Sequence, residues 1–361
     1  MRLISLAGDG IGPEIVASTL RVLEAVDARH DLALAIDHDE IGLASLERHG
    51  TTLRDELLER ARTYDGIILG PQSNASYPPP EQGGRNITAA FRSRLDLFAN
   101  VRPARTRPAV PTRMAPGRTM DLVIMREATE GFYADRNMTR GSGEMMPSPD
   151  MALAMRKITR HGCERIARQA FELAARRRRK VTAIHKANCF LMTCGLFLEA
   201  CRAVARDFPE VELEEMIVDA AAAHLVREPE RFDVLCATNL FGDILSDLVS
   251  ELSGSIGLAG SINASNTLCC AQAQHGSPPD IQGQDIANPT SMILSCAMLL
   301  DWLARCHGKP AMREAATTIE AAVETALADP ATRTRDLGGA LGTRAFTDTV
   351  IAALGERPAR S

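Results

Sequence analysis

The sequence predicts an α/β protein in which a mixed parallel sheet is flanked by helices. Short apolar runs, such as residues 2–7 and 65–70, have the length and composition of buried strands. Longer stretches with apolar residues at helical spacing, such as 13–26 and 240–252, alternate with these runs along the chain. Strands that alternate with helices in this way are typical of parallel sheets covered by helices.

The first strand ends in the sequence GDGIGPE, and Pro13 and Glu14 suit the first turn of the helix that follows. The stretch 71–84 contains four prolines and two glycines and therefore predicts a loop. Further strands are expected at residues 33–37, 98–104, 120–126, 180–185, 213–218 and 232–236. Further helices are expected at residues 51–63, 86–95, 161–177, 190–206, 219–227, 290–306, 310–327 and 345–354.

Three segments do not fit the alternation of strands and helices. Residues 134–150 are polar, contain Gly and Pro, and predict an arm or hairpin that reaches out of the body. Residues 254–289 are rich in Gly, Ser, Asn and Pro, which predicts a long functional loop system. The basic run Arg176–Lys180 is interpreted as a solvated helix end.

The composition limits the classes of partner. A chain of 361 residues is long enough for two ordinary domains. Its 41 basic and 46 acidic residues leave a net charge of −5, which argues against nucleic acid as a partner. We expect a cytoplasmic protein with no membrane partner, because no apolar run is long enough for a signal peptide or a membrane span. The nine cysteines show no CxxC spacing, so reduced thiols are expected.

Paired carboxylates are the first candidate for chemistry. Asp243 and Asp247, in NLFGDILSDL, share one face of the predicted helix about one turn apart. The repulsion between two such charges is relieved by a divalent cation, and oxygen ligands of this kind suit Mg²⁺ or Mn²⁺. Asp219 lies at a strand-to-helix junction and is a candidate third ligand. The alternatives are an ordinary acidic helix face for the pair and a helix N-cap for Asp219.

Three arginines are candidates for binding an acid. Arg92 lies on a predicted helix, Arg102 follows DLFANV, and Arg126 ends an apolar strand. Arginine binds carboxylates in a bidentate manner, so three together suit a di- or tricarboxylate. Each one alone is also explained by a surface position or an ion pair.

Tyr133 and Lys186 are candidates for proton transfer. Tyr133 lies in the polar loop EGFYADRN, and Lys186 follows the apolar strand end VTAIH. A lysine at such a position is partly desolvated, which predicts a lowered pKa of the kind that a proton carrier requires. Core packing, or a hydroxyl satisfied by the protein, is the alternative for either residue.

Two turn-rich segments are candidates for holding a nucleotide. The first, Gly8–Gly12, has the spacing G-x-G-x-G rather than G-x-G-x-x-G, and Glu14 in the first helical turn disfavours phosphate there. The second comprises HGSPPD at 275–280 and IANP at 286–289.

These motifs together resemble those of the β-decarboxylating dehydrogenases, the family of isopropylmalate, isocitrate, homoisocitrate and tartrate/D-malate dehydrogenases. The matching stretches are GDGIGPE, RLDLFANVRP, REATEGFYA, HKAN, NLFGDILSDL and HGSPPDIQGQDIANP with the helix after it. They occur in this order over nearly the whole chain.

The resemblance implies a role for each candidate. Arg92, Arg102 and Arg126 would bind the carboxylates of the malate portion. Tyr133 would protonate the enol, and Lys186 would take the proton of the 2-hydroxyl. The implied reaction converts a (2R)-hydroxy acid and NAD into a keto acid, CO₂ and NADH. The implied ligands of Mg²⁺ or Mn²⁺ are Asp219, Asp243 and Asp247.

The implied cofactor is NAD. Asn188 would touch the nicotinamide side, and Asp280, followed by Ile281, would accept the ribose hydroxyls and repel a 2′-phosphate. The residues that would wrap the adenosine are His275, Gly276, Ser277, Asp280, Ile281 and Asn288.

The implied fold is the isopropylmalate dehydrogenase-like two-domain fold, distinct from the dinucleotide-binding Rossmann fold. One domain would comprise 1–101 and 254–361, on the cofactor side. The other, 102–253, would carry the metal and substrate site and the arm near 134–150 that joins a homodimer or tetramer. Lys186 and Asp219 would reach the site across the dimer interface.

The sequence departs from isopropylmalate dehydrogenases where the family selects its substrate. Those enzymes place leucines on the helix before the first arginine, whereas this chain has Arg85, Thr88 and Ala89. Gln272 stands where relatives commonly carry Glu. We therefore expect an acid of the isocitrate/homoisocitrate or malate/tartrate type. The alternatives are 3-isopropylmalate dehydrogenase of leucine biosynthesis and a non-catalytic regulatory subunit of a heteromeric dehydrogenase.

Overall fold

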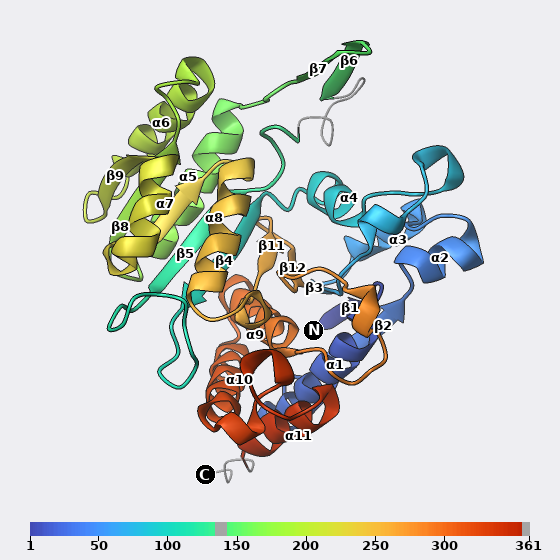
Figure 1. The fold of residues 1–361 in the computed structure, drawn as a ribbon. Coiled ribbons are helices and arrows are strands. Elements are labelled where there is room, and N and C mark those ends of the chain that lie inside the picture. The colour runs from blue at the N-terminus through green and yellow to red at the C-terminus, as the bar shows by residue number, and fades with distance from the viewer. Residues whose placement is uncertain (134–142, 356–361) are drawn as a thin grey trace. The chain divides into compact units, whose positions relative to one another are not determined.

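The computed structural model describes residues 1–133 and 143–355, which form two compact units (Figure 1). Unit 1 comprises Met1–Phe91, Arg107–Pro111 and the chain from Gly254 onward, and unit 2 comprises Arg92–Thr106 and Thr112–Ser253. The chain therefore first changes unit at 91/92 and finally returns to unit 1 at 253/254. The predicted domain boundaries are 101/102 and 253/254.

Unit 1 contains five strands in the order β2-β1-β3-β12-β11. All neighbouring pairs are parallel except β11 and β12, which are antiparallel. Their bounds are β1 Arg2–Leu6, β2 Ala35–Asp39, β3 Gly66–Leu69, β11 Ile262–Ala264 and β12 Cys269–Gln272. The last two are short strands within 254–289, the segment that was predicted as a long loop system. They escape sequence analysis because each is only three or four residues long and lacks a run of large apolar residues.

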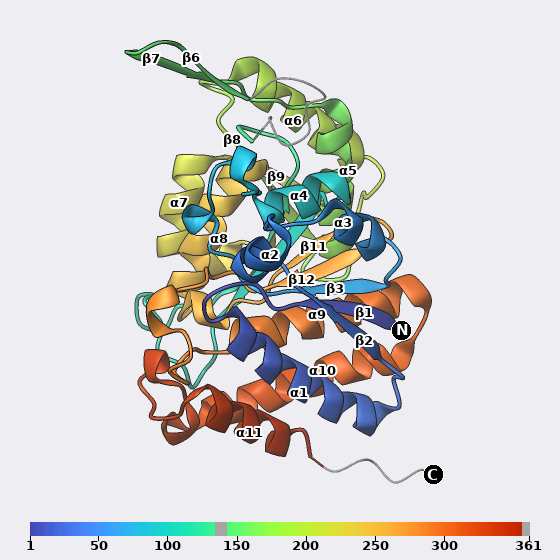
Figure 2. The same ribbon diagram turned by 90° about the vertical axis from the view of Figure 1, so that its right-hand side faces the viewer.

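The helices of unit 1 gather mainly on one side of these strands, where α1, α9, α10 and α11 lie together (Figure 2). The bounds in unit 1 are α1 Gly12–His30, α2 Gly42–His49, α3 Asp55–Ala61, α9 Thr290–His307, α10 Pro310–Ala328 and α11 Thr343–Ala353. α2 is absent from the prediction, because it has no side-chain N-cap and begins at Gly42, whose φ of 74° is left-handed.

The large sheet of unit 2 has five strands among the described residues, in the order β4-β5-β10-β8-β9, parallel except for the antiparallel pair β4 and β5. Their bounds are β4 Ala99–Arg105, β5 Asp121–Glu127, β8 Lys180–His185, β9 Glu212–Ile217 and β10 Val234–Ala237. The helices are α5 Arg160–Ala174, α6 Leu191–Ala205, α7 Val218–Arg227 and α8 Asn239–Leu252, while α4 Ile87–Arg94 carries the chain from unit 1 into unit 2.

Both faces of the central strand β10 of unit 2 are buried. Val234 and Cys236 pack in the cluster that includes α5 and α6, and Leu235 and Ala237 pack in the cluster that includes α7 and α8. Successive side chains of a strand point to opposite faces, so an entirely apolar strand requires helices on both. The predicted α/β class with a mixed, mostly parallel sheet flanked by helices is confirmed.

A hairpin of β6 Glu144–Ser148 and β7 Met151–Ala154 lies within the segment predicted as an arm. All of its residues are exposed, including Met145, Met146 and Leu153. The first part of the predicted arm, 134–142, lies outside the described residues. No helix among the described residues is long and apolar enough to cross a membrane.

Candidate active site

The two carboxylates of α8 lie against a buried arginine of β4. Arg102 Nη1 donates to Asp243 Oδ1 at 3.2 Å, to Asp247 Oδ1 at 3.3 Å and to Ser246 Oγ at 2.7 Å. Arg102 is 8% exposed, whereas both carboxylates have substantial exposed surface. Burial lowers the pKa of the Arg102 guanidinium, and the two carboxylates oppose that shift. The predicted repulsion between the aspartates is thus relieved by a guanidinium.

Arg126, at the end of β5, reaches the same carboxylate from the neighbouring strand. Its Nη1 donates to Asp243, and its Nε and Nη2 donate to Asn239 Oδ1 at 2.9 and 2.6 Å. Gly242 permits this approach, because a Cβ there would lie 2.7 Å from the Cβ of Arg126. The structure therefore brings together two of the three predicted arginines and two of the three predicted metal ligands. Arg92, the third arginine, lies buried near the end of α4.

Lys186 and Asp219 form a separate ion pair in unit 2. Lys186 follows β8, Asp219 lies in the first turn of α7, and Nζ lies 2.6 Å from Oδ1. The hydrogen bond to Asp219 raises the pKa of Lys186, so the expectation of a lowered pKa is wrong. The same bond lowers the pKa of Asp219. The N-cap alternative for Asp219 is also wrong, because the cap position of α7 is Ile217.

The loop between β5 and Tyr133 is held by two buried carboxylates that sequence analysis missed. Glu127 accepts hydrogen bonds from Thr129 N at 2.9 Å and from Glu130 N at 2.8 Å, and burial raises its pKa. Glu130 accepts from Thr159 N at 2.8 Å, and its backbone carbonyl accepts from Asn239 Nδ2 at 2.9 Å. The available signal was the segment EATE directly after Arg126, which places two carboxylates around a threonine at the end of an apolar strand.

Arg85 and Thr88, the predicted substrate-selecting residues, lie in unit 1 and already have protein partners. Arg85 Nη1 donates to Asp55 Oδ1 and to the Leu53 carbonyl, both at 2.9 Å. Arg85 and Asp55 also line a cavity of about 480 Å³. Thr88 Oγ1 donates to Gln72 Oε1 at 2.6 Å and accepts from Gln272 Nε2 at 2.8 Å. Gln272 is thus part of an uncharged network around Thr88, where a Glu would add a charge.

The predicted cofactor loop packs on the first βα turn of unit 1. The Ser277 carbonyl accepts from Ile11 N at 2.9 Å, and a Cβ at Gly10 would lie 1.9 Å from that same oxygen. Ser277 Oγ lies 2.7 Å from Ser73 Oγ. Asn288 Nδ2 donates to Asp336 Oδ2 at 2.9 Å. The remaining predicted cofactor residues, Asp280 and Ile281, lie in the short 3-10 helix Pro279–Ile281, and Asn188 lies in a turn of unit 2.

The glycine-rich turn itself serves the protein's own structure. Asp9 is buried, and it accepts hydrogen bonds from Leu43 N at 2.7 Å, from Ser73 N at 3.0 Å and from the Tyr77 hydroxyl. Burial and this bond to Asp9 raise the pKa of Tyr77. Burial raises the pKa of Glu14, in the first turn of α1. Through its hydrogen bonds, Asp9 ties the first βα turn to the start of α2 and to the loop after β3.

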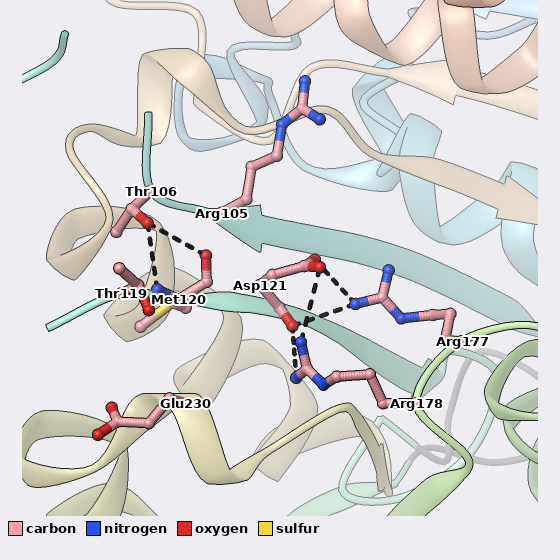
Figure 3. A pocket seen from close by; sticks show the side chains of 8 residues that line it. All are labelled: Arg105, Thr106, Thr119, Met120, Asp121, Arg177, Arg178 and Glu230. Atoms are coloured by element: carbon pink, nitrogen blue, oxygen red, sulfur yellow. Dashed lines mark hydrogen bonds and ion pairs between the residues drawn. The ribbon is translucent and has the colours of Figure 1, made fainter. Parts of the chain in front are cut away.

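Another cavity, of about 440 Å³, lies in unit 2 and is lined by two arginines of the basic run at 176–180 (Figure 3). Arg177 and Arg178 converge on Asp121 at the start of β5, while Arg105 points away from them. Arg177 Nε also donates to Asp233 Oδ1 at 2.7 Å, and Asp233 is 1% exposed. The interpretation as a solvated helix end is thus wrong for Arg177, which pairs with the buried Asp233, whereas Arg178 is exposed. The cavity contains none of the predicted site residues.

The residues present fit a divalent cation and a dinucleotide. Carboxylate oxygens on one helical turn are hard ligands of the kind that Mg²⁺ and Mn²⁺ prefer. Among the described residues no three Asp, Glu, His or Cys side chains gather in one place, so Asp219 does not join Asp243 and Asp247 within one chain. On the cofactor side, His275 Nε2 is buried without a hydrogen-bond partner in the described part of the chain. A Cβ at Gly276, the next residue, would meet nothing within 4 Å.

Comparison with known proteins identifies the family. A sequence model described as isocitrate/isopropylmalate dehydrogenase matches residues 2–351. The chain is 42% identical over 354 residues to isocitrate/homoisocitrate dehydrogenase of Thermus thermophilus, covering 98% of each. It is 39% identical to 3-isopropylmalate dehydrogenase of Archaeoglobus fulgidus, covering 98% of this chain and 99% of that one. A crystal structure of isocitrate dehydrogenase from Methylococcus capsulatus matches with a TM-score of 0.85 and 37% identity, over 98% and 99% of the two chains. The chain belongs to the isocitrate/isopropylmalate dehydrogenase family.

Proposed function

We propose that this protein catalyses the NAD-linked, metal-dependent oxidation and decarboxylation of a (2R)-hydroxy acid of the malate type. The observation that carries the proposal is the convergence of two buried guanidiniums, Arg102 and Arg126, on the carboxylates of α8. Cationic groups for substrate carboxylates and oxygen ligands for a divalent cation thereby lie side by side. The products are a keto acid, CO₂ and NADH.

Different residues of the chain bind the substrate and transfer protons. Arg92, Arg102 and Arg126 bind the substrate carboxylates, and this exchange frees oxygens of the α8 aspartates for a cation. Lys186 receives the proton of the 2-hydroxyl, for which it must first lose its own proton, and Tyr133 delivers a proton to C3 after CO₂ has left. Mg²⁺ or Mn²⁺ would supply Lewis acidity toward the 2-hydroxyl and its neighbouring carboxylate, and NAD would accept the hydride.

The geometry favours a site completed by a second copy of the chain. Lys186 and Asp219 are held together in one place and Asp243 and Asp247 in another, so one chain alone does not assemble three acidic ligands among its described residues. A homodimer that brings Asp219 of one copy to α8 of the other satisfies both observations.

The substrate we propose is an isocitrate- or homoisocitrate-type tricarboxylate. Arg85 offers a cation, and Thr88 a hydroxyl that is already hydrogen-bonded, where an alkyl substituent would require apolar contacts. A third carboxylate would compete for Arg85 with Asp55, whose side chain is 68% exposed and therefore forms a weak ion pair. The Thermus thermophilus relative, named for isocitrate and homoisocitrate, supports this choice.

An NADH-absorbance screen with Mn²⁺ over malate, tartrate, isocitrate, homoisocitrate and 3-isopropylmalate tests the proposal. We expect a tricarboxylate to have the highest kcat/KM. Replacing Arg85 by Leu removes a charge-assisted hydrogen bond worth about 1.5–3 kcal/mol, or roughly 10- to 150-fold in kcat/KM. The loss should be confined to tricarboxylates. Arg54→Leu is the matched control, because Arg54 lines the same cavity but pairs with Asp39.

The outcomes separate the alternatives. A wild-type preference for 3-isopropylmalate, or an unchanged ranking in Arg85→Leu, refutes the tricarboxylate proposal. Absence of NADH formation with every acid refutes the catalytic proposal and favours a regulatory subunit. With the preferred acid, we expect NAD to exceed NADP in kcat/KM, because a 2′-phosphate near Asp280 would meet a like charge. Equal values for the two cofactors would contradict the role of Asp280.

A further inference from the structure

A guanidinium held by three aromatic rings lies at the base of the β6–β7 hairpin. Arg156 follows β7, and its Cζ lies 5.7 Å from the ring centroid of Phe132, 5.1 Å from that of Phe190 and 5.2 Å from that of Phe241. The rings of Phe132 and Phe190 also meet edge to face at 6.2 Å. Only ten phenylalanines occur in the chain, so three around one cation form a specific arrangement rather than a random apolar environment.

The edges of the same guanidinium are engaged by neutral acceptors. Nη1 of Arg156 donates to Thr193 Oγ1 at 3.0 Å and to Cys194 Sγ at 3.2 Å, and Nη2 donates to Thr238 Oγ1 at 3.1 Å. Among the described residues no carboxylate lies within ion-pair distance of Arg156. A planar guanidinium can present its faces to rings and its edge to acceptors at the same time, which an ammonium group cannot do.

Two of the segments that meet at Arg156 carry the proposed proton-transfer groups. Phe132 immediately precedes Tyr133 in the chain. Cys194 Sγ, which accepts from Arg156, also accepts from the backbone N–H of Lys186 at 3.3 Å. One side chain is therefore a direct neighbour of the Tyr133 loop and is one hydrogen-bonded atom away from Lys186.

The third segment is the start of α8, the helix that carries the proposed metal ligands Asp243 and Asp247. Thr238 is the N-cap residue of α8, and Phe241 lies two positions before Asp243. Arg156 therefore contacts two residues at the start of α8. The three segments are far apart in sequence and have Arg156 as a common partner.

We propose that Arg156 is a positioning residue that holds the segments of Tyr133, Lys186 and Asp243 in one arrangement. The inference rests on the proposed function for the chemistry of those three groups. Arg156 couples the three segments mechanically, because loss of its planar guanidinium removes contacts to all three segments at once. The guanidiniums proposed to bind the substrate are not among its partners, so the effect falls on kcat more than on KM.

Arg156→Met and Arg156→Lys test this on the full-length enzyme. Misplacement of reacting groups by about 1 Å costs roughly 100-fold in rate. We expect kcat to fall about that much in Arg156→Met, with KM within about threefold of wild type. Arg156→Lys should recover little, because an ammonium keeps the charge but loses the planar fork. The control Arg168→Met, which loses a single-ring contact to Phe208 and an ion pair to Asp207, should keep wild-type kcat.

Amide hydrogen exchange supplies a readout that does not depend on turnover. In Arg156→Met, protection should fall together in 128–133, 186–195 and 238–244 and stay unchanged in unit 1. Wild-type kcat, or a loss of protection in one segment only, overturns the proposal. If Arg156→Met does not fold, the same two criteria apply to Arg156→Lys. If the wild type oxidises no acid, the proposed function fails, and joint loss of protection still supports the coupling while its absence refutes it.

Discussion

Gly242→Ala should disable the enzyme although it favours the helix. Gly242 lies in α8 between Phe241 and Asp243, and a Cβ there would lie 2.7 Å from Cβ and 2.8 Å from Cγ of Arg126. Carbon atoms in contact are normally about 3.5–4.0 Å apart, so α8 or Arg126 must move by about 1 Å. These atoms belong to the root of a side chain that is 2% exposed, and they cannot swing aside.

The two contributions to stability have opposite signs. Replacing glycine by alanine inside a helix gains about 0.8–1.0 kcal/mol, whereas overpacking a close contact costs about 1–3 kcal/mol. The free energy of unfolding should therefore fall by roughly 0–2 kcal/mol. A displacement of about 1 Å between Arg126 and Asp243 should lower kcat/KM by about 100-fold.

Gly195→Ala is the matched control. Gly195 lies inside α6, and a Cβ there would meet nothing within 4 Å. We expect this variant to gain about 1 kcal/mol in urea unfolding and to keep wild-type kcat/KM. If Gly242→Ala behaves like Gly195→Ala in both assays, the tight approach of α8 to β5 has no bearing on activity and the reasoning is wrong.

Three further predictions concern charged groups. The chain has four lysines, so NMR titration of the metal-free enzyme can resolve Lys186. The pKa of Lys186 should lie above the ordinary lysine value in the wild type and should fall in Asp219→Asn. A pKa that is unchanged in the variant would count against the ion pair. Stability from this pair is present below the ordinary lysine pKa and is lost as the pH rises through the raised one. Tyr77→Phe should lower the free energy of unfolding by about 1 kcal/mol. Asp9→Asn should lower it more, because the amide nitrogen of Asn would face backbone N–H donors. Equal losses of stability in the two variants would contradict this reasoning. EDTA should abolish turnover, and Asp243→Asn should weaken Mn²⁺ binding and rate together; full activity in EDTA would exclude the metal role.

Much of the architecture could be predicted from periodicity alone. The buried parallel strands are short apolar runs, and long helices such as α1 and α8 have a strong apolar spacing. The missed elements, α2, β11 and β12, are short, and their local sequence lacks caps or large apolar residues. Their conformation depends on partners far away in the chain, which periodicity does not reveal.

The candidate site, too, could be predicted from the sequence only in part. The identities of Asp243, Asp247, Arg102 and Arg126 were predicted, but not their mutual ion pairs, because pairing across a strand and a helix leaves no trace in spacing. The pKa of Lys186 was predicted in the wrong direction for the same reason. The partial burial of Lys186 could be predicted from the strand before it, whereas Asp219, the carboxylate that raises the pKa of Lys186, comes from α7.

The order of strands in unit 1 has a consequence for synthesis on the ribosome. Leu69 of β3 pairs with Gln272 of β12, so the edge of β3 has no sheet neighbour until the whole of unit 2 has been translated. Unit 2 is nearly continuous in sequence and can close as soon as residue 253 emerges. We therefore expect the nascent chain to fold from the middle outward. An exposed β3 edge would be the part of the emerging chain most in need of a chaperone.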